Sequence, residues 1–492
     1  MQIFNLINKG CLLPALLAVC VMAVGCNAPA TLQMSSSEII RNDLNDIYPE
    51  AGVESLSLEG AIDRALEYNL DARIAEKDYQ VAMSDADLQK LSALPSLTAK
   101  ADFLTRNNDG ASSSQSTITG TQSLEPSISA EPTRFTSLLE MNWNVLDSVL
   151  SIYRSKSAVD RAIIAEERAR KVRQNIIMDV YSAYWRTAVS RELGGRIADI
   201  NAESDRQLEN LEAARSAGDL EQSRIHSAEV EMLEKRASLL SIYEEFSLAE
   251  IELKALISYP LDKPLVLIYP ENIFEFDSFM NIKGSAEDFV DFALKKRPEI
   301  AEELLNKKIA ERDVKLQIYE TIPGLNLLVN ANYDENKFLV DNRWLSLTAS
   351  LTQNINNIIT FSSRYERAKQ QQALADARRR ALIAAVAAQV YIAKRLHENA
   401  NDRYAALNRL SKKYTAEAVR LEKRRDVGLI GGLEFVNISM DALIAELKHL
   451  NSAASVHSTF ARFANSIGFD YSDYKRLDLF TLAEQRIGGG NG

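Results

Sequence analysis

The residue best placed for covalent chemistry is Cys26, which ends the tetrapeptide Ala23-Val24-Gly25-Cys26. It follows a short apolar run, Cys11–Val24, that Lys9 precedes with a positive charge. Such a run is too short to span a membrane as a helix and has the layout of an export signal. Small residues before a cysteine are typical of signal cleavage with acylation of the thiol, although Ala23 stands where leucine is commonest. We predict a signal peptide over 1–25 and a lipid on Cys26; the alternative is an ordinary secretory signal.

No other cysteine chemistry is expected. Cys11 and Cys20 lie inside the predicted signal, so the mature chain keeps one cysteine. One cysteine excludes an intrachain disulfide and a thiolate metal site.

Histidine chemistry is equally sparse. The four histidines, His226, His397, His449 and His457, fall within predicted helices, and none shows the HExxH spacing. His449 and His457 share a helix face, but the sequence supplies no third and fourth ligand nearby. We predict that the chain is not an enzyme and holds neither a metal nor a cofactor.

The charge of the chain argues against nucleic acid as a partner. The formal net charge is −11, whereas a nucleic-acid-binding surface needs a basic footprint. An acidic balance fits a protein whose interior passes cations or polar solutes, and it also favours solubility.

The two halves of the sequence repeat each other, so the elements that would position a site are present twice. One set of matches has a constant offset of 228, and it includes Ser57 with Ser285, Asp85 with Asp313 and Pro95 with Pro323. A second set has an offset of 210: Asn144, Arg154, Val180, Tyr181 and Gly218 match Asn354, Arg364, Val390, Tyr391 and Gly428. A duplicated unit implies pseudo-symmetric architecture, so function should be sought where equivalent parts converge. We interpret the matched Tyr181 and Tyr391 as packing residues.

Each half contains one very long predicted helix. The stretch 148–216 lacks proline, the stretch 357–426 lacks both glycine and proline, and both are rich in strong helix formers. Helices of this length persist only when packed laterally, as in a coiled coil. Each ends at a glycine, Gly218 or Gly428, and a returning helix follows over 220–257 or 433–467. Two further helices are expected, over about 58–94 and 286–322, with ends fixed by Pro95 and Pro323.

Strands with period two follow each of these prolines. Leu97, Ala99 and Ala101 alternate with polar residues in the first half, and Leu345, Leu347 and Leu351 do so in the second. An apolar face opposite Asn, Ser, Thr and charged residues is typical of membrane β-barrel strands. Phe103, Phe135, Tyr333 and Trp344 flank the connecting loops, as an aromatic girdle would. The alternative is a pair of half-buried hairpins in a soluble sheet.

Four strands cannot close a barrel, and open edges are not tolerated in lipid because backbone groups would be unsatisfied. If the strands span a membrane, several copies must pool them. Three copies would supply twelve strands and six pseudo-equivalent helical hairpins.

With these features together, the sequence resembles the TolC-like outer-membrane factors, the exit ducts of efflux pumps and type I secretion systems. The resemblance covers about 56–468, and order, spacing and duplication together make it specific. The motifs that carry it are Ser57-Leu58-Glu59-Gly60-Ala61, Leu94-Pro95-Ser96-Leu97, Arg297-Pro298-Glu299-Ile300, Ile322-Pro323-Gly324-Leu325 and Val427-Gly428-Leu429.

The resemblance implies a mainly α fold with a membrane β-barrel, built from two tandem strand–helix repeats. A homotrimer would form a twelve-stranded barrel in the cell outer membrane and a long α-helical barrel in the periplasm. Its helical tips, Gly218 and Val427-Gly428-Leu429, would dock a periplasmic adaptor joined to an inner-membrane transporter.

The resemblance also implies a periplasmic gate. In the family, acidic residues six and nine positions after the second tip glycine ring the closed aperture, and here those positions hold Glu434 and Asn437. Arg224, near the first tip, is a candidate partner for Glu434; the alternative is that both are unpaired surface charges.

We divide the chain into a signal peptide (1–25), a lipidated extension (26–55), a first repeat (56–258), an equatorial linker (259–284), a second repeat (285–468) and a tail (469–492). The predicted function is a passive outer-membrane exit channel of a tripartite machine. The alternative is a lipid-anchored periplasmic coiled-coil scaffold or adaptor.

Overall fold

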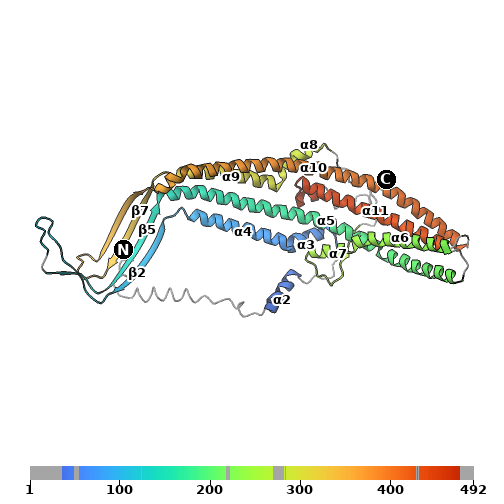
Figure 1. Ribbon diagram of the computed structural model, residues 1–492, viewed down its shortest axis with the longest axis horizontal. Coiled ribbons are helices and arrows are strands. Elements are labelled where there is room, and N and C mark those ends of the chain that lie inside the picture. Colours follow the sequence, from blue (N-terminus) through green and yellow to red (C-terminus); the bar gives the residue numbers. More distant parts are fainter. Residues whose placement is uncertain are drawn as a thin grey trace, which may run out of the picture.

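The computed structural model describes residues 36–48, 55–122, 125–217, 222–269, 282, 284–427, 429 and 432–476. The chain is elongated, with a β-sheet at one end and the tips of two helical hairpins at the other (Figure 1). Cys26, Gly218 and Gly428 lie outside the described residues, as does nearly all of the segment 270–283.

One four-stranded antiparallel sheet forms the first end of the molecule. Its strands are β2 (Ser96–Thr105), β5 (Thr133–Asn144), β7 (Gly324–Asp334) and β8 (Arg343–Thr352), and their order in the sheet is β2-β5-β7-β8. The two central strands, β5 and β7, come from different halves of the sequence and pair with Glu140 opposite Asn330. This pairing joins the two repeats, and β2 and β8 are left as the edges.

Two small sheets accompany the main one. The loop between β2 and β5 contains a hairpin of β3 (Gly110–Ser112) and β4 (Ser127–Ala130). At mid-length, β1 (Ser55–Leu56) pairs in parallel with β6 (Val266–Leu267), so the predicted equatorial linker includes a strand.

The long helices are confirmed. Helix α5 (Val145–Ala217) has 73 residues and α10 (Ile355–Asp426) has 72. An asparagine starts each one: the Asn144 side chain accepts a hydrogen bond from the Asp147 amide, and Asn354 accepts one from the Asn356 amide. These caps convert a strand directly into a helix at equivalent positions of the two repeats. The returning helices are α6 (Gln222–Ser247) with α7 (Ala249–Leu256), and α11 (Gly432–Ser466).

The expected continuous helices over 58–94 and 286–322 are each broken in two. The first half has α3 (Leu58–Tyr68) and α4 (Leu70–Leu91), and the second has α8 (Ala286–Lys296) and α9 (Pro298–Tyr319). Asn69 ends α3 and also caps α4, since its side chain accepts hydrogen bonds from two amides of α4. Arg297 precedes Pro298, which occupies the first turn of α9 and keeps the preceding residue extended. Short helices α2 (Ser36–Ile47) and α12 (Tyr471–Arg476) complete the described chain.

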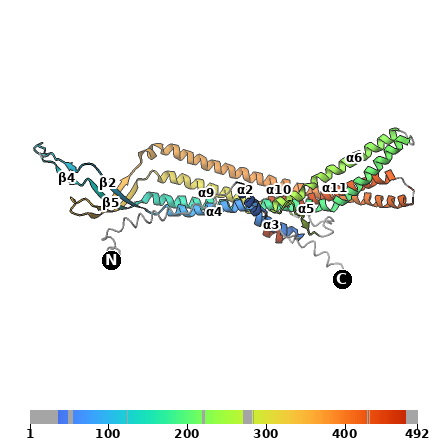
Figure 2. The same ribbon diagram turned by 90° about the horizontal axis from the view of Figure 1, so that it is seen from below.

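The helices lie side by side in an order that changes along the molecule. Beside the sheet the order is α4-α5-α9-α10, and toward the tips it is α5-α6-α11-α10 (Figure 1). Figure 2 shows the α5–α6 hairpin rising away from the α10–α11 hairpin at the tips. The largest core cluster lies between α3, α5, α7 and α11, where Tyr181, Leu253 and Ala461 are almost fully buried.

None of the helices in the described ranges combines the length and apolar character required to cross a membrane.

Candidate functional site

The hairpin tips are the first candidate site. Val427 and Leu429 are 68% and 66% exposed, and the Leu429 amide closes the turn by donating to the Arg424 carbonyl at 2.9 Å. Glu434 is exposed in the first turn of α11, and Asn437 is partly buried one turn later. Arg224 lies in α6, but its side chain is outside the described set, so its contact with Glu434 stays a prediction.

Near Glu434, an ion pair that was not predicted from the sequence joins α6 of the first hairpin to α11 of the second. The Lys235 ammonium lies 2.9 Å from Asp441 of α11 and 2.9 Å from Glu231 of its own helix. Burial alone would lower the pKa of Lys235, but hydrogen bonds from Asp441 and Glu231 outweigh it and raise the pKa. Only the Glu231–Lys235 spacing was visible in the sequence, because Lys235 and Asp441 are far apart along the chain.

Beneath this ion pair, three fully buried side chains, Met232, Val436 and Met440, pack between α6 and α11. A wide-open cavity of about 510 Å³ lies between α6 and α11, lined by Lys235, Asp441, Glu434 and Asn437 among others. The predicted gate residues Glu434 and Asn437 thus share one cavity with the Lys235–Asp441 pair. An apolar contact and a charged clasp together hold the two hairpins at this level.

The sheet is the second candidate site. Residues directly opposite in the register share a face, and one row across the four strands is Leu97, Met141, Val329 and Leu347. Leu97, Leu345, Leu347 and Leu351 are 68–80% exposed, so the predicted apolar face is uncovered in the single chain. The neighbouring row on the other face is Thr98, Glu140, Asn330 and Ser346, as the alternation predicted.

The predicted aromatic girdle needs one correction. Phe103 pairs with Phe135, and the Phe135 ring lies 6.3 Å from that of Tyr333, so these three share the apolar face. Trp344 pairs with Asn332, which places it on the opposite, polar face. Successive side chains of a strand point to opposite faces of the sheet. Trp344 precedes Leu345, which lies on the apolar face, so Trp344 lies on the other face.

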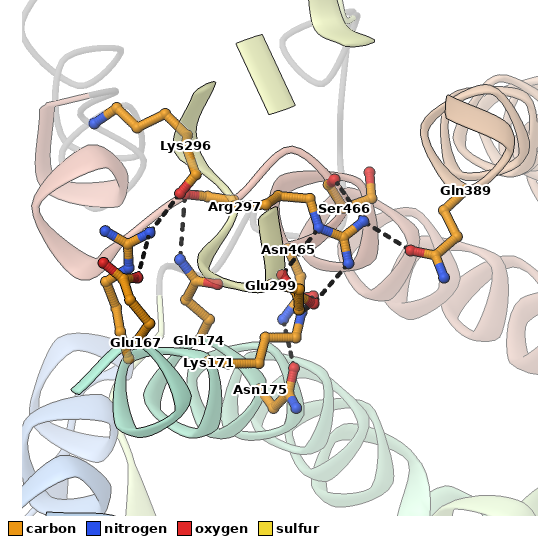
Figure 3. Close-up of polar contacts among 12 residues, drawn as sticks. Glu167, Lys171, Gln174, Asn175, Lys296, Arg297, Glu299, Gln389, Asn465 and Ser466 are labelled. Atoms are coloured by element: carbon orange, nitrogen blue, oxygen red, sulfur yellow. Dashed lines mark hydrogen bonds and ion pairs between the residues drawn. The ribbon is translucent and has the colours of Figure 1, made fainter. Parts of the chain in front are cut away.

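A buried polar cluster ties the two repeats together at mid-length (Figure 3). Arg297 is only 6% exposed; it donates to both Glu299 oxygens, to Gln389 at 2.7 Å and to the Ser466 carbonyl at 3.3 Å. Lys171 of α5 reaches Glu299 at 3.1 Å. Burial alone would raise the pKa of Glu299, but Arg297 and Lys171 outweigh it and lower the pKa to about 2.

The equivalent junction of the first repeat uses the same contact. Asn69, which matches Arg297 at offset 228, donates to the Leu256 carbonyl, and Leu256 matches Ser466 at offset 210. Two residues later Ser258 and Gly468, again equivalent, both have positive φ, 49° and 81°. The Arg-Pro-Glu-Ile motif therefore marks a structural junction.

Of the histidines and the two matched tyrosines, His457, His397 and Tyr181 are buried packing residues, whereas Tyr391 is exposed. His457 is buried, stacks on Trp185 with ring centroids 4.3 Å apart, and shares a 3.2 Å hydrogen bond with Tyr181. His397 is buried beside Thr459 and Asn401. Tyr391, in contrast, is 47% exposed and donates to Glu287, so only Tyr181 is a core residue. Within the described ranges, no group of three or more His, Cys, Asp or Glu residues is arranged to hold a metal ion.

A four-stranded sheet that continues into two long helical hairpins is the fold of the TolC-like outer-membrane factors, and the predicted resemblance is confirmed at the level of the fold. Solved structures of membrane proteins match most of the chain. The outer-membrane channel CmeC of Campylobacter jejuni has a TM-score of 0.64 at 15% identity, with 87% of this chain and 89% of that chain covered. The open-state channel MtrE of Neisseria gonorrhoeae has a TM-score of 0.62 at 16% identity, covering 84% and 88%. A membrane protein from Pseudomonas aeruginosa has a TM-score of 0.65 at 15% identity, covering 84% and 92%. No family model and no curated protein matches the sequence.

Proposed function

We propose that this chain forms a passive exit channel in the outer membrane, as part of an efflux or type I secretion machine. The observation that carries the proposal is one continuous body with two different surfaces. An exposed apolar sheet face, with leucines at 68–80% exposure, joins directly to long helices whose exposed residues are predominantly polar and charged. Such a body is suited to lipid at one end and to water at the other.

The proposed assembly is a homotrimer. A four-stranded sheet with two free edges cannot lie in lipid alone, and three copies would close twelve strands into a barrel. The long hairpins would then form a hollow periplasmic cylinder. Energy for export would come from an inner-membrane transporter, since the channel itself needs only to open and close.

The tips are the proposed docking site for a periplasmic adaptor. Exposed Val427 and Leu429 flank the second tip and offer apolar contacts to a partner. Glu434, repeated by three-fold symmetry, would form an acidic constriction that attracts cations. In this proposal the Lys235–Asp441 clasp stabilises the closed arrangement of the hairpins.

Single-channel recording in planar bilayers tests the channel. The purified full-length protein should conduct ions with cation selectivity and block by trivalent cations, and Glu434→Gln should weaken both. A protein that inserts no pores, or that is released from membranes once its lipid anchor is removed, would support the scaffold alternative instead.

Export assays test the docking site. Gly428→Val should abolish export while trimers remain in the membrane, because a bulky β-branched side chain would be placed on the surface proposed to contact the adaptor. Val419→Ala, an exposed change in α10, is the matched control and should leave export unchanged. Normal export by Gly428→Val would remove this tip from the docking site.

A further inference from the structure

The first helical hairpin contains two weak points at one level along its length. Helix α5 carries the pair Gly194-Gly195 in its interior, and the returning helix is interrupted at Leu248, which separates α6 from α7. The two points lie close together, because a Cβ added at Gly194 would be 3.3 Å from the hydroxyl oxygen of Tyr243, near the end of α6. Glycine pairs are a common cause of helix bending, since glycine favours the helix less than any residue except proline.

The second hairpin has neither weak point. At offset 210 the glycine pair corresponds to Tyr404 and Ala405, inside the unbroken helix α10, and Leu248 corresponds to Ser458, inside the unbroken helix α11. Tyr404 is only 5% exposed, and its ring centroid lies 5.2 Å from that of His449 in α11. The second hairpin is therefore continuous and tightly packed at the level where the first is interrupted.

Packing between the helices accounts for one of the two glycines. Tyr243 of α6 corresponds to Ala453 of α11, so a large and a small residue have changed places between the repeats. In the first hairpin the large side chain comes from α6 and lies beside Gly194, whereas in the second it comes from α10. This exchange leaves Gly195 unexplained, because its counterpart Ala405 shows that alanine suits the helix at this position.

Beyond this level, toward the tip, the two helices of the first hairpin are joined into one unit. Arg236 of α6 pairs with Asp205 of α5, and nearer the tip Arg215 of α5 pairs with Glu229 of α6. Both ion pairs connect α5 to α6, so they hold the two helices together along the arm. An arm that is tied internally in this way moves as a rigid body when its root bends.

The packing between the two hairpins also decreases beyond this level. The large mid-length core extends to Ile197 of α5 and Leu239 of α6, about one turn past the glycine pair and Tyr243. Farther toward the tips, the described contacts between α6 and α11 are the small apolar cluster around Met232 and the ion pair of Lys235 with Asp441. Figure 2 accordingly shows the α5–α6 hairpin diverging from α10–α11 toward the tips.

We infer that α5–α6 is the mobile hairpin and that it swings as a unit about a hinge at Gly194-Gly195 and Leu248, while α10–α11 stays fixed. The inference rests on the proposed channel and specifies which of its two hairpins opens the mouth. Ala217, the last residue of α5, lies roughly 35 Å along the helix from Gly194, so a bend of about 10° would move the tip by roughly 6 Å. Such a movement would separate Lys235 from Asp441, because this ion pair lies on the tip side of the hinge.

Distances between spin labels on the full-length protein in membranes test which hairpin moves, with labelled copies diluted among unlabelled ones. One pair joins the root of the second hairpin to the arm of the first, with labels at Ile392→Cys and Glu234→Cys. The matched pair joins the root of the first to the arm of the second, with labels at Ile251→Cys and Val419→Cys. All four sites are exposed. The first pair should give a broad distribution of distances and the second a narrow one; equal widths or the reverse order would overturn the inference.

Exchanging one methyl group between the hairpins tests the hinge itself. Gly195→Ala should narrow the distribution of the first pair. Ala405→Gly, the reverse change at the matched exposed position, should broaden the distribution of the second. Gly195 is a better target than Gly194, because an alanine at 194 would press on the Tyr243 hydroxyl. A first-pair distribution that Gly195→Ala leaves unchanged would exclude this hinge.

Single-channel recording separates the hinge from the channel. Gly195→Ala should lower the open population about five-fold, since alanine favours an unbent helix over glycine by about that factor, and it should leave the conductance of the open pore unchanged. If the wild type conducts and Gly195→Ala opens as often as the wild type, the hinge is wrong while the channel proposal stands. If the wild type forms no pores, the channel proposal fails, and the spin-label distances still decide whether the first hairpin swings.

Discussion

At the scale of single residues, the histidine of the buried aromatic cluster sets a pH limit on folding. Burial, together with the charge of nearby His397, lowers the pKa of His457 from 6.5 to about 3. Between pH 6.5 and about 3, His457 is protonated in the unfolded chain but neutral in the folded one. Protonation therefore favours the unfolded state, and the free energy of unfolding decreases as the pH falls through this range. The loss is about 1.4 kcal/mol per pH unit, or about 2 kcal/mol at pH 5.

We expect His457→Phe to reduce this acid sensitivity, because phenylalanine keeps the stacking on Trp185 and does not titrate. The measurement is thermal unfolding at pH 7.5 and pH 5, and the difference in Tm should be smaller than in the wild type. His226→Phe, at an exposed site, is the control and should leave the difference unchanged. Identical pH responses of wild type and His457→Phe would contradict the assignment.

A second prediction concerns Gly468, which contacts Arg297 at the junction between α8 and α9. Gly468 has φ of 81°, and a Cβ added there would lie 3.2 Å from the Arg297 backbone. We expect Gly468→Ala to lower stability by about 1–2 kcal/mol from the backbone conformation alone. Denaturant unfolding measures the loss. Gly60→Ala is the control, since its nearest neighbours would be 3.4 Å away in a helix, where alanine is favoured. Equal stabilities of the two variants would contradict the strain.

At the scale of elements, the described contacts between α6 and α11 toward the tips are the Lys235–Asp441 clasp and a small apolar contact, beyond the large core that α5 and α11 share at mid-length. Lys235 and Asp441 are mostly buried, with side-chain exposures of 18% and 31%, so their attraction is less screened than that of a surface pair. If the clasp stabilises the closed mouth, neutralising either partner should favour the open one.

We predict that Lys235→Gln and Asp441→Asn each raise the open population roughly five-fold, which corresponds to about 1 kcal/mol. Single-channel recording measures this change, and the double variant should add little to either single change because both remove one interaction. Lys448→Gln, at an exposed position of α11, is the control. Unchanged opening in both variants would show that the clasp only positions the hairpins.

At the scale of the whole molecule, the lipid and the sheet would anchor the protein independently. A proposed barrel would hold the protein in the membrane by itself, so the lipid on Cys26 would not be needed for retention. We therefore predict that Cys26→Ser impairs targeting more than membrane retention. Mass spectrometry of the mature N-terminus should show an acylated Cys26 in the wild type. Carbonate washing of membranes should leave the correctly targeted fraction of the variant in place, and its release would assign anchoring to the lipid.

The sequence alone determined the repeat, the strand positions and the two long helices, because these follow from local periodicity, helix propensity and proline. Even the break at Arg297 could have been predicted, since proline favours the first helical turn. The break at Asn69 depends on capping by the asparagine side chain, and the face of Trp344 depends on its phase relative to Leu345.

Only the tertiary structure decided which faces are covered. Lys235 meets Asp441, and Arg297 meets Ser466, across long separations that no local pattern specifies. Ile309 and Leu316 of α9 are buried, whereas the equivalent Val81 and Leu88 of α4 are exposed, because α9 lies between α5 and α10 and α4 lies at the edge of the row. Side-chain pairing depends on which elements become neighbours, and that is a property of the packed chain.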